Sequence, residues 1–303
     1  MRDIGRVETQ KETIVDRFSS ISVPVKGYQA RRSSPFLRLK NVFTRFLDSA
    51  LFPSSEWTLR RRLIREGGRF PPRPPQHAWI NTALKSNQQI QAALEEVRSC
   101  GLPPHLDLPK NWDAITALSL VLKYTGTSAK ILDAGAPLYS RILPWLYMYG
   151  YRDLWGIDLV YSRPLRRGPI HYERGDLTGT RFDEGSFEAI TCLSVIEHGV
   201  VLDAFLREMS RLLRPGGLLI ISTDYWTASI DTRGQVAYGH PIKIFSEQDV
   251  AKFVTCAEGC GLRVLQPVDL ECQERTITWK PYNLNYTSMS IALHKADVVS
   301  DNS

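Results

Sequence analysis

The stretch ILDAGAP at residues 131–137 decides the fold, together with four runs that follow it along the chain. These runs are LWGIDLV (154–160), GDL (175–177), FEAITCLSVIEH (187–198) and RLLRPGGLLIISTDYW (211–226). Short unbroken apolar runs that alternate with helical patterns are typical of parallel strands covered on both faces. We therefore expect a doubly wound α/β sheet, with the strand at 130–134 in its centre beside the second and fourth runs.

Acidic residues and a glycine stand where the first three strands of this sheet should end. Asp133 and Gly135 follow the first run, Asp158 ends the second, and Asp176 ends the third. Open α/β sheets bind their ligands at the carboxyl ends of the strands, and an acid there can hold both hydroxyl groups of a ribose. A glycine lets the backbone turn tightly and approach a ligand closely. This order of residues predicts a nucleotide-type ligand site.

Residues 111–295 resemble the class I S-adenosylmethionine-dependent methyltransferases, in particular the type 11 branch. The resemblance rests on the acid-x-glycine loop, on IEH at 196–198 after the fourth strand, and on LLRPGG at 212–217 before the fifth. It implies a Rossmann-like sheet of seven strands, the last one antiparallel, and S-adenosyl-L-methionine as the cofactor.

The resemblance also implies which residues border the cofactor. Its expected neighbours are Asp133, Gly135 and Ala136 at the methionine end, Asp158 and Leu159 at the ribose, Asp176 and Leu177 at the adenine, and Ser194 beside the methionine moiety. One departure stands in the loop, where Pro137 replaces a further glycine of the family. Proline has a fixed φ and no N–H group, so we expect a differently shaped loop.

Three residues are candidates for catalysis, namely His198, Asp224 and His240. The methyl sulfonium is already electrophilic, so the protein mainly has to align an acceptor and exclude water. A hydroxyl acceptor benefits in addition from a general base. We expect transfer to oxygen of a small-molecule or glycan acceptor, with aromatic walls at Tyr225 and Trp226, and we expect no metal.

Three other functions stay open at this point. The chain could keep the fold without catalysis and act through its basic arm, a reading that Pro137 favours. It could methylate RNA, which the arginine-rich arm favours. A nicotinamide-dependent dehydrogenase shares the ribose acid, but its usual G-x-G-x-x-G is missing from this sequence.

The basic charge is concentrated at the N-terminal end. The whole chain carries a formal charge of +6, and residues 1–80 hold 16 Lys and Arg against 7 Asp and Glu. The remainder is mildly acidic, which weakens the case for nucleic acid binding by the catalytic-looking domain. Five scattered cysteines argue against a disulfide framework. With no secretory signal at the N-terminus, we expect a cytoplasmic protein, in part peripheral to the membrane.

We expect a basic N-terminal extension over residues 1–75, a helical connector over 76–110, the methyltransferase domain over 111–295 and a tail over 296–303. Apolar residues recur at three- and four-residue spacing in 35–52 and predict a basic amphipathic helix. A second basic helix is expected over 56–66. Residues 35–66 could dock on an anionic membrane surface or an acidic partner, or pack on the protein's own domain.

The other expected elements follow from local patterns. They are helices over 77–99 and 112–124, a long loop over 227–244 that could act as a lid, a helix capped by Ser246 with Asp249 in its first turn, and strands over 261–267 and 287–295.

Overall fold

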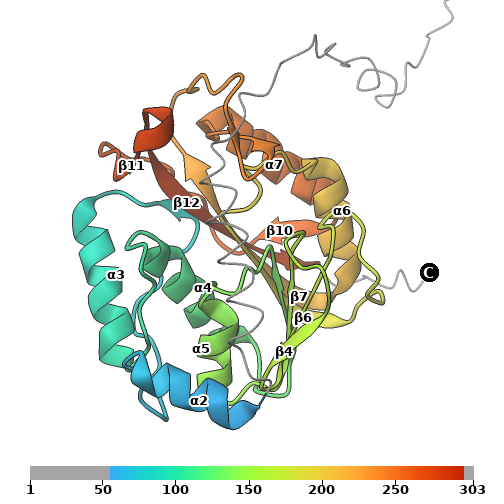
Figure 1. Ribbon diagram of the computed structural model, residues 1–303. Helices are drawn as coiled ribbons and strands as arrows, with labels where there is room; N and C mark the ends of the chain where they lie inside the picture. The colour runs from blue at the N-terminus through green and yellow to red at the C-terminus, as the bar shows by residue number, and fades with distance from the viewer. Residues whose placement is uncertain (1–54, 297–303) are drawn as a thin grey trace, which may run out of the picture. The chain divides into compact units, whose positions relative to one another are not determined.

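The computed structural model of the protein describes residues 55–296 (Figure 1). The expected helix over 35–52 and the tail from 297 lie outside the described residues. The helices are α2 (Glu56–Arg65), α3 (Asn87–Cys100), α4 (Lys110–Tyr124), α5 (Ile142–Met148), α6 (Leu202–Leu212), α7 (Glu247–Gly259) and the short 3-10 helix η2 (Lys280–Tyr282).

The strands are β1 (Thr82–Ala83), β2 (Lys130–Ala134), β3 (Asp153–Ile157), β4 (Leu165–Arg167), β5 (Ile170–Glu173), β6 (Phe187–Leu193), β7 (Leu213–Tyr225), β8 (Val236–Ala237), β9 (His240–Pro241), β10 (Leu262–Val264), β11 (Ile277–Trp279) and β12 (Leu284–Lys295).

The main sheet has the strand order β1-β12-β7-β6-β2-β3-β5-β4, and β10 and β11 also pair with β12. The pairs from β5 through β3, β2 and β6 to β7 are parallel, whereas β12 runs antiparallel to β7 and to β10. The expected sheet of seven strands with an antiparallel last strand is therefore confirmed, and it carries extra short strands at its edges. The expected place of β2 between β3 and β6 is confirmed as well.

Helices cover both faces of this sheet (Figure 1). α3, α4 and α5 lie on one face, and α6 and α7 lie on the other. Each face has its own core of buried side chains, one with Ile131 and Leu154 and the other with Leu132 and Ile190. Alternate residues of a strand point to opposite faces, so the unbroken apolar runs supply both cores.

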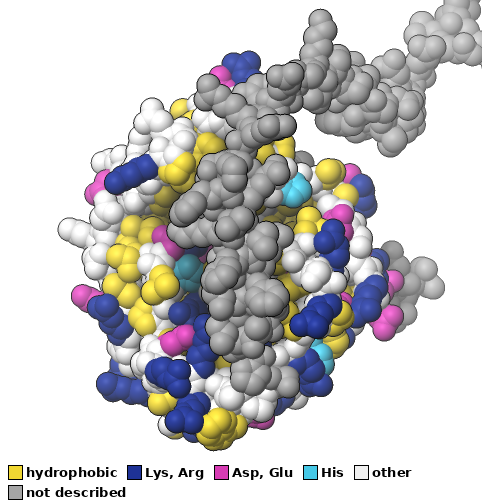
Figure 2. Space-filling model, viewed as in Figure 1, with side chains coloured by type: hydrophobic (Ala, Val, Ile, Leu, Met, Phe, Trp, Pro, Cys, Tyr) yellow, Lys and Arg dark blue, Asp and Glu magenta, His cyan; other side chains and the backbone are white. Residues whose placement is uncertain are grey.

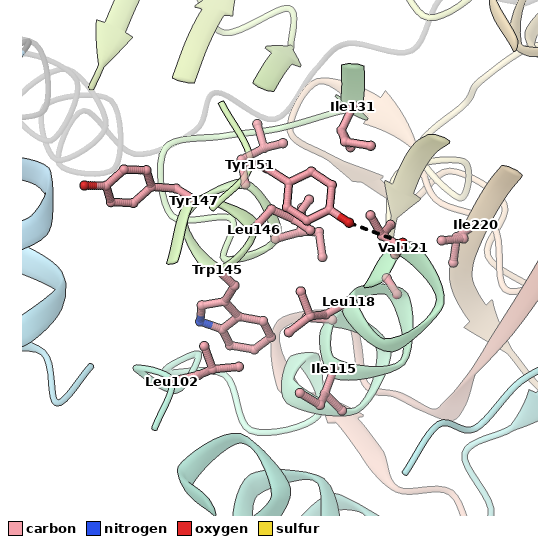
Figure 3. Close-up of a cluster of buried hydrophobic side chains, with 14 of the residues drawn as sticks. Leu102, Ile115, Leu118, Val121, Ile131, Trp145, Leu146, Tyr147, Tyr151 and Ile220 are labelled. Atoms are coloured by element: carbon pink, nitrogen blue, oxygen red, sulfur yellow. Dashed lines mark hydrogen bonds between the residues drawn. The ribbon is translucent and has the colours of Figure 1, made fainter. Parts of the chain in front are cut away.

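The aromatic residues of α5 fill the first of these cores (Figure 3). Trp145 is fully buried and donates its indole N–H to the carbonyl of Pro103 at 3.0 Å. Tyr151 is also buried, and its hydroxyl contacts that of Thr125 at 2.9 Å. A buried Tyr or Trp requires such a polar partner. These rings pack the helix rather than forming a stacking surface.

Two of the expected elements differ from the structure. The helix expected over 77–99 begins only at Asn87, because residues 77–86 form an extended segment in which β1 pairs with β12. The segment 227–244 is not one open loop, since β8 and β9 form a hairpin within it. By contrast, Ser246 and Asp249 form a capping box at the start of α7, as the sequence predicts.

Two further observations bear on the extension. α2 matches the second expected basic helix, and its buried Leu59 and Leu63 belong to the core beside α5. Between residues 55 and 296, no helix is long and apolar enough to cross a membrane.

Candidate functional site

The loop after β2 is held close to the end of β3. Both the Gly135 and Ala136 amides donate to the carbonyl of Ile157, at 2.8 and 2.9 Å. Gly135 has φ +83, and a Cβ built on it would lie 2.4 Å from a methyl group of Val195. No side chain fits at that distance, so this position needs glycine both for its backbone conformation and for its space.

Asp133, at the end of β2, stabilises the same loop through hydrogen bonds. Its side chain is 2 % exposed, and its two oxygens accept hydrogen bonds from the hydroxyls of Thr191 and Ser140, each at 2.7 Å. Burial raises the pKa of this carboxyl to about 6, against the opposing effect of both hydroxyls. Ser140 reaches Asp133 because its amide closes a turn on the carbonyl of Pro137 at 2.8 Å. The loop at Pro137 thus closes into a compact turn.

The other two strand-end acids follow β3 and β5, and one of them, Asp176, lines a cavity. Asp158 follows β3, and its carboxylate accepts the amide of Val160 at 2.9 Å. Asp176 follows β5 and accepts the amide and hydroxyl of Thr178, which lowers the pKa of its carboxyl. A cavity of about 380 Å³ opens here, lined by Ile157, Leu159, Glu173, Arg174, Gly175, Asp176, Gly179, Thr180, Arg181 and Phe182. Leu159 is exposed beside it, whereas Leu177 is buried.

Ser194 lies on the other side of β2, after β6. Its backbone has φ +55, a conformation that non-glycine residues seldom adopt. Its amide donates to the carbonyl of Ser222 at 2.9 Å, and its hydroxyl lies 3.4 Å from the carboxylate of Asp113. Strained backbone of this kind concentrates at ligand sites.

A cluster of buried ionisable groups lies between α4, the turn after β6, and β7. Asp113, Glu197 and Asp224 are all less than 7 % exposed. Asp113 accepts the Ser222 hydroxyl at 2.7 Å. Burial raises the pKa of Asp224 to about 6, although the ammonium group of Lys110 opposes the shift. The pKa of Glu197 is raised as well, by burial and by the charge of the neighbouring Asp224.

His198 projects from the same turn and faces the hairpin. Burial, Lys110 and His240 lower the pKa of its imidazole to about 4, so the ring is neutral at pH 7. Its Nδ1 atom is buried and has no hydrogen-bond partner within residues 55–296. A Cβ on the adjoining Gly199 would lie 3.7 Å from the Cβ of His240. The structure therefore brings two of the predicted catalytic residues, His198 and His240, to one place.

Sequence reasoning missed part of this cluster. Lys110, Asp113 and Tyr286 were not among the predicted site residues, and the hydroxyl of Tyr286 hydrogen bonds to Asp224. A signal for Asp113 was present, because it is a charge on a helix whose other residues from Asn111 to Leu118 are all buried. A buried charge requires polar partners, which places it at a site or in a network.

Comparison with known proteins points to one class. Residues 132–221 match the family model of a methyltransferase domain. A stretch of 39 residues is 49% identical to the ubiquinone biosynthesis O-methyltransferase of Xanthomonas oryzae pv. oryzae, and it covers 13% of this chain and 16% of that protein. The match thus spans about a sixth of the length of this curated relative.

Two solved structures are similar in fold. One is an S-adenosylmethionine-dependent methyltransferase from Mesorhizobium loti, with 16% identity and a TM-score of 0.45, covering 61% of this chain and 99% of that one. The other is phosphoethanolamine N-methyltransferase 2 of Haemonchus contortus in complex with S-adenosyl-L-methionine, with 13% identity and a TM-score of 0.43, covering 60% and 52%.

Residues 132–221 therefore carry a methyltransferase domain, and S-adenosylmethionine is the cofactor to test against the site. Its strand-end residues fit that cofactor. Gly135 keeps the loop free of side-chain atoms, and Asp158 offers a carboxylate at the end of β3. The cavity beside Asp176 leaves room for a flat ring.

Proposed function

We propose that this protein transfers a methyl group from S-adenosylmethionine to a hydroxyl oxygen of a small-molecule acceptor, with His198 as the general base. When bound, the cofactor supplies an electrophilic methyl group. The observation that carries the proposal is the neutral imidazole of His198, whose buried Nδ1 atom lacks a partner. The neutral ring can take the proton of an acceptor hydroxyl as the oxygen–methyl bond forms.

The other residues have supporting roles in this proposal. Asp133, Gly135 and Ala136 shape the loop at the methionine end, and Ser194 borders it from β6. Asp158 with Leu159 binds the ribose, while Asp176 with Leu177 flanks the adenine. These assignments are supported by the place of each residue at the carboxyl ends of β2, β3, β5 and β6.

In this proposal His240 acts on His198 rather than on the acceptor, and Asp224 stays within the buried cluster. Asp224 is buried and hydrogen bonds to Tyr286, so it is not presented to a ligand. His240 lowers the proton affinity of His198 by its own charge when protonated. We infer that His240 helps to set the electrostatic environment of the base.

The test is a methyl-transfer assay that detects S-adenosylhomocysteine, with a panel of hydroxylated small molecules as acceptors. His198→Gln should lower kcat/KM by about 10²- to 10⁴-fold, the range for a lost general base. Binding of S-adenosylhomocysteine should stay unchanged in the same variant. His294→Gln is the matched control, because His294 lies on β12 at its pairing with β10. Full activity of a folded His198→Gln protein would contradict the role of the base.

We also propose that α2 docks on an anionic membrane surface, which would make the protein peripheral to membranes. Trp57, Arg61 and Ile64 share the outer face of this helix, opposite the buried leucines, and Trp57 and Ile64 are 64% and 52% exposed. Arg60 and Arg65 flank this face. Figure 2 shows Lys and Arg side chains gathered over this lower end of the molecule, around α2.

The charges of α2 favour an anionic partner. Glu56 is paired with Arg152, and Glu66 is paired with Arg62 and Arg141. Both acids of this helix region are therefore engaged. A face that combines Trp with several Arg is suited to the interface of an anionic bilayer.

Vesicle co-sedimentation tests this docking. The full chain should bind vesicles that contain phosphatidylserine, and it should bind pure phosphatidylcholine far less. The double change Arg61→Gln and Arg65→Gln should weaken binding on the order of 30-fold, since each basic residue contributes about 1 kcal/mol at such a surface. Arg233→Gln, on the exposed pair with Asp231, is the control. Equal binding by the double variant would refute the role of α2.

A further inference from the structure

The tip of the β8–β9 hairpin holds a tyrosine in an unfavourable conformation. Tyr238 and Gly239 form the two-residue connection, and both have positive φ, 54° and 90°. This geometry belongs to a type I′ turn, whose first position favours Asn, Asp or Gly. A tyrosine at this position does not stabilise the turn. Residues with such rarely populated backbone angles are concentrated at active sites and ligand-binding sites.

Tyr238 extends over the proposed base. Its side chain is 80% exposed, and its ring centroid lies 5.3 Å from that of His198, edge to face at 85°. Trp279 of β11 approaches His198 at 6.4 Å and 82°, and Tyr282 packs on Trp279 at 4.6 Å. Aromatic rings therefore flank the imidazole from the hairpin and from the β11–η2 segment.

The hairpin is fixed in this place by its neighbours. A Cβ on Gly199 would lie 3.0 Å from Pro241, so the hairpin packs directly on the turn after His198. The Lys243 amide donates to the carbonyl of Glu197 at 2.9 Å. The Tyr282 hydroxyl donates to the carbonyl of Val236 at 2.7 Å. The backbone that carries Tyr238 is thus held on both strands of the hairpin.

Other exposed apolar side chains stand in the loops before α4 and after β2 and β3. Leu106 is 92% exposed and Tyr139 is 66% exposed, and the Tyr139 ring lies 6.2 Å from that of His105. Leu159 and Val160 follow β3 and are also exposed. Single exposed apolar residues are ordinary, but several of them around one site point to a ligand surface.

We propose that Tyr238 and Trp279 are specificity-determining residues that hold the flat, apolar body of a hydroxyl-bearing acceptor against His198. This inference rests on the proposed function and narrows its acceptor to that class. Rings favour flat apolar partners in stacked or edge-on contact. A sugar, by comparison, carries several hydroxyl groups that need polar partners once water is displaced, and the rings here offer few.

The test separates acceptor binding from turn stability. Tyr238→Asn places a residue that favours this turn, so the variant should melt at the same temperature as the wild type or higher. It should nevertheless weaken binding of 2-naphthol, used as a flat hydroxylated probe, by about three- to tenfold. Tyr238→Phe keeps the ring and should bind like the wild type. Saturation-transfer NMR with excess S-adenosylhomocysteine measures the binding, and methyl α-D-glucopyranoside serves as the sugar probe.

Two results would overturn the inference. One is a 2-naphthol signal that is absent in the wild type or equal in Tyr238→Asn. The other is a methyl glucoside signal that depends on Tyr238. Calorimetry with S-adenosylhomocysteine alone tests the proposed function separately. A wild-type protein that does not bind S-adenosylhomocysteine would refute the proposed function, whereas a protein that binds it but fails the 2-naphthol test would refute only the role of Tyr238 and Trp279.

Discussion

Gly135→Ala tests the loop after β2 directly. At φ +83 an alanine meets the unfavourable left-handed backbone region, which costs about 1 to 2 kcal/mol. Its Cβ would also lie 2.4 Å from Val195, and such overpacking costs about 1 to 3 kcal/mol when neighbours must move. Together these effects predict a loss of roughly 2 to 5 kcal/mol of unfolding free energy.

Urea denaturation followed by circular dichroism measures this loss. The double variant Gly135→Ala with Val195→Ala removes the clash but keeps the backbone strain, so it should recover part of the stability after allowance for the cost of Val195→Ala alone. Gly126→Ala is the matched control, because a Cβ there meets nothing within 4 Å. A Gly135→Ala protein as stable as the Gly126→Ala protein would show that the loop after β2 tolerates a side chain at position 135.

Three further predictions follow from buried groups. Leu63→Ala should cost about 2 to 5 kcal/mol in urea denaturation, because Leu63 is 1% exposed and anchors α2 in the core, and a cost near zero would show that α2 is detached. Ser246→Ala should cost about 1 kcal/mol by removing the capping box of α7, and an unchanged unfolding midpoint would contradict that contribution. The pKa of His198 is about 4 in the folded protein, below its unfolded value near 6.5. Between these values the unfolded state binds a proton that the folded state does not, so the unfolding free energy falls as the pH falls from about 6.5 to about 4. Unfolding free energies measured from pH 7 to pH 4 should therefore fall less steeply in His198→Gln, and identical slopes would show that His198 titrates normally.

The sequence predicted the sheet well because its evidence is local and repeated. Leu132 and Ile190 stand in unbroken apolar runs, and such runs require cover on both faces wherever they lie. The cap at Ser246 was predictable for the same reason, since both partners stand within four residues. Asp133, Asp158 and Asp176 could be placed at strand ends by position alone.

The features that the sequence did not predict depend on contacts between distant parts of the chain. Asp113 meets Ser222 across more than a hundred residues, and no local pattern reports that meeting. β1 forms only because β12 offers it an edge, so residues 77–86 leave the helical pattern expected of them. Tyr238 could not be singled out either, because its significance lies in its φ and in its distance from His198.

Calorimetry with S-adenosylhomocysteine measures whether the cofactor binds, as proposed, at the carboxyl ends of β2, β3 and β5. Asp158→Ala removes the carboxylate proposed to hold the ribose, and charged hydrogen bonds contribute about 1.5 to 3 kcal/mol each, so affinity should fall about tenfold or more. Asp153→Ala, at the opposite end of the same strand, is the control and should bind like the wild type. Unchanged affinity in a folded Asp158→Ala protein would show that the ribose is not held at the end of β3.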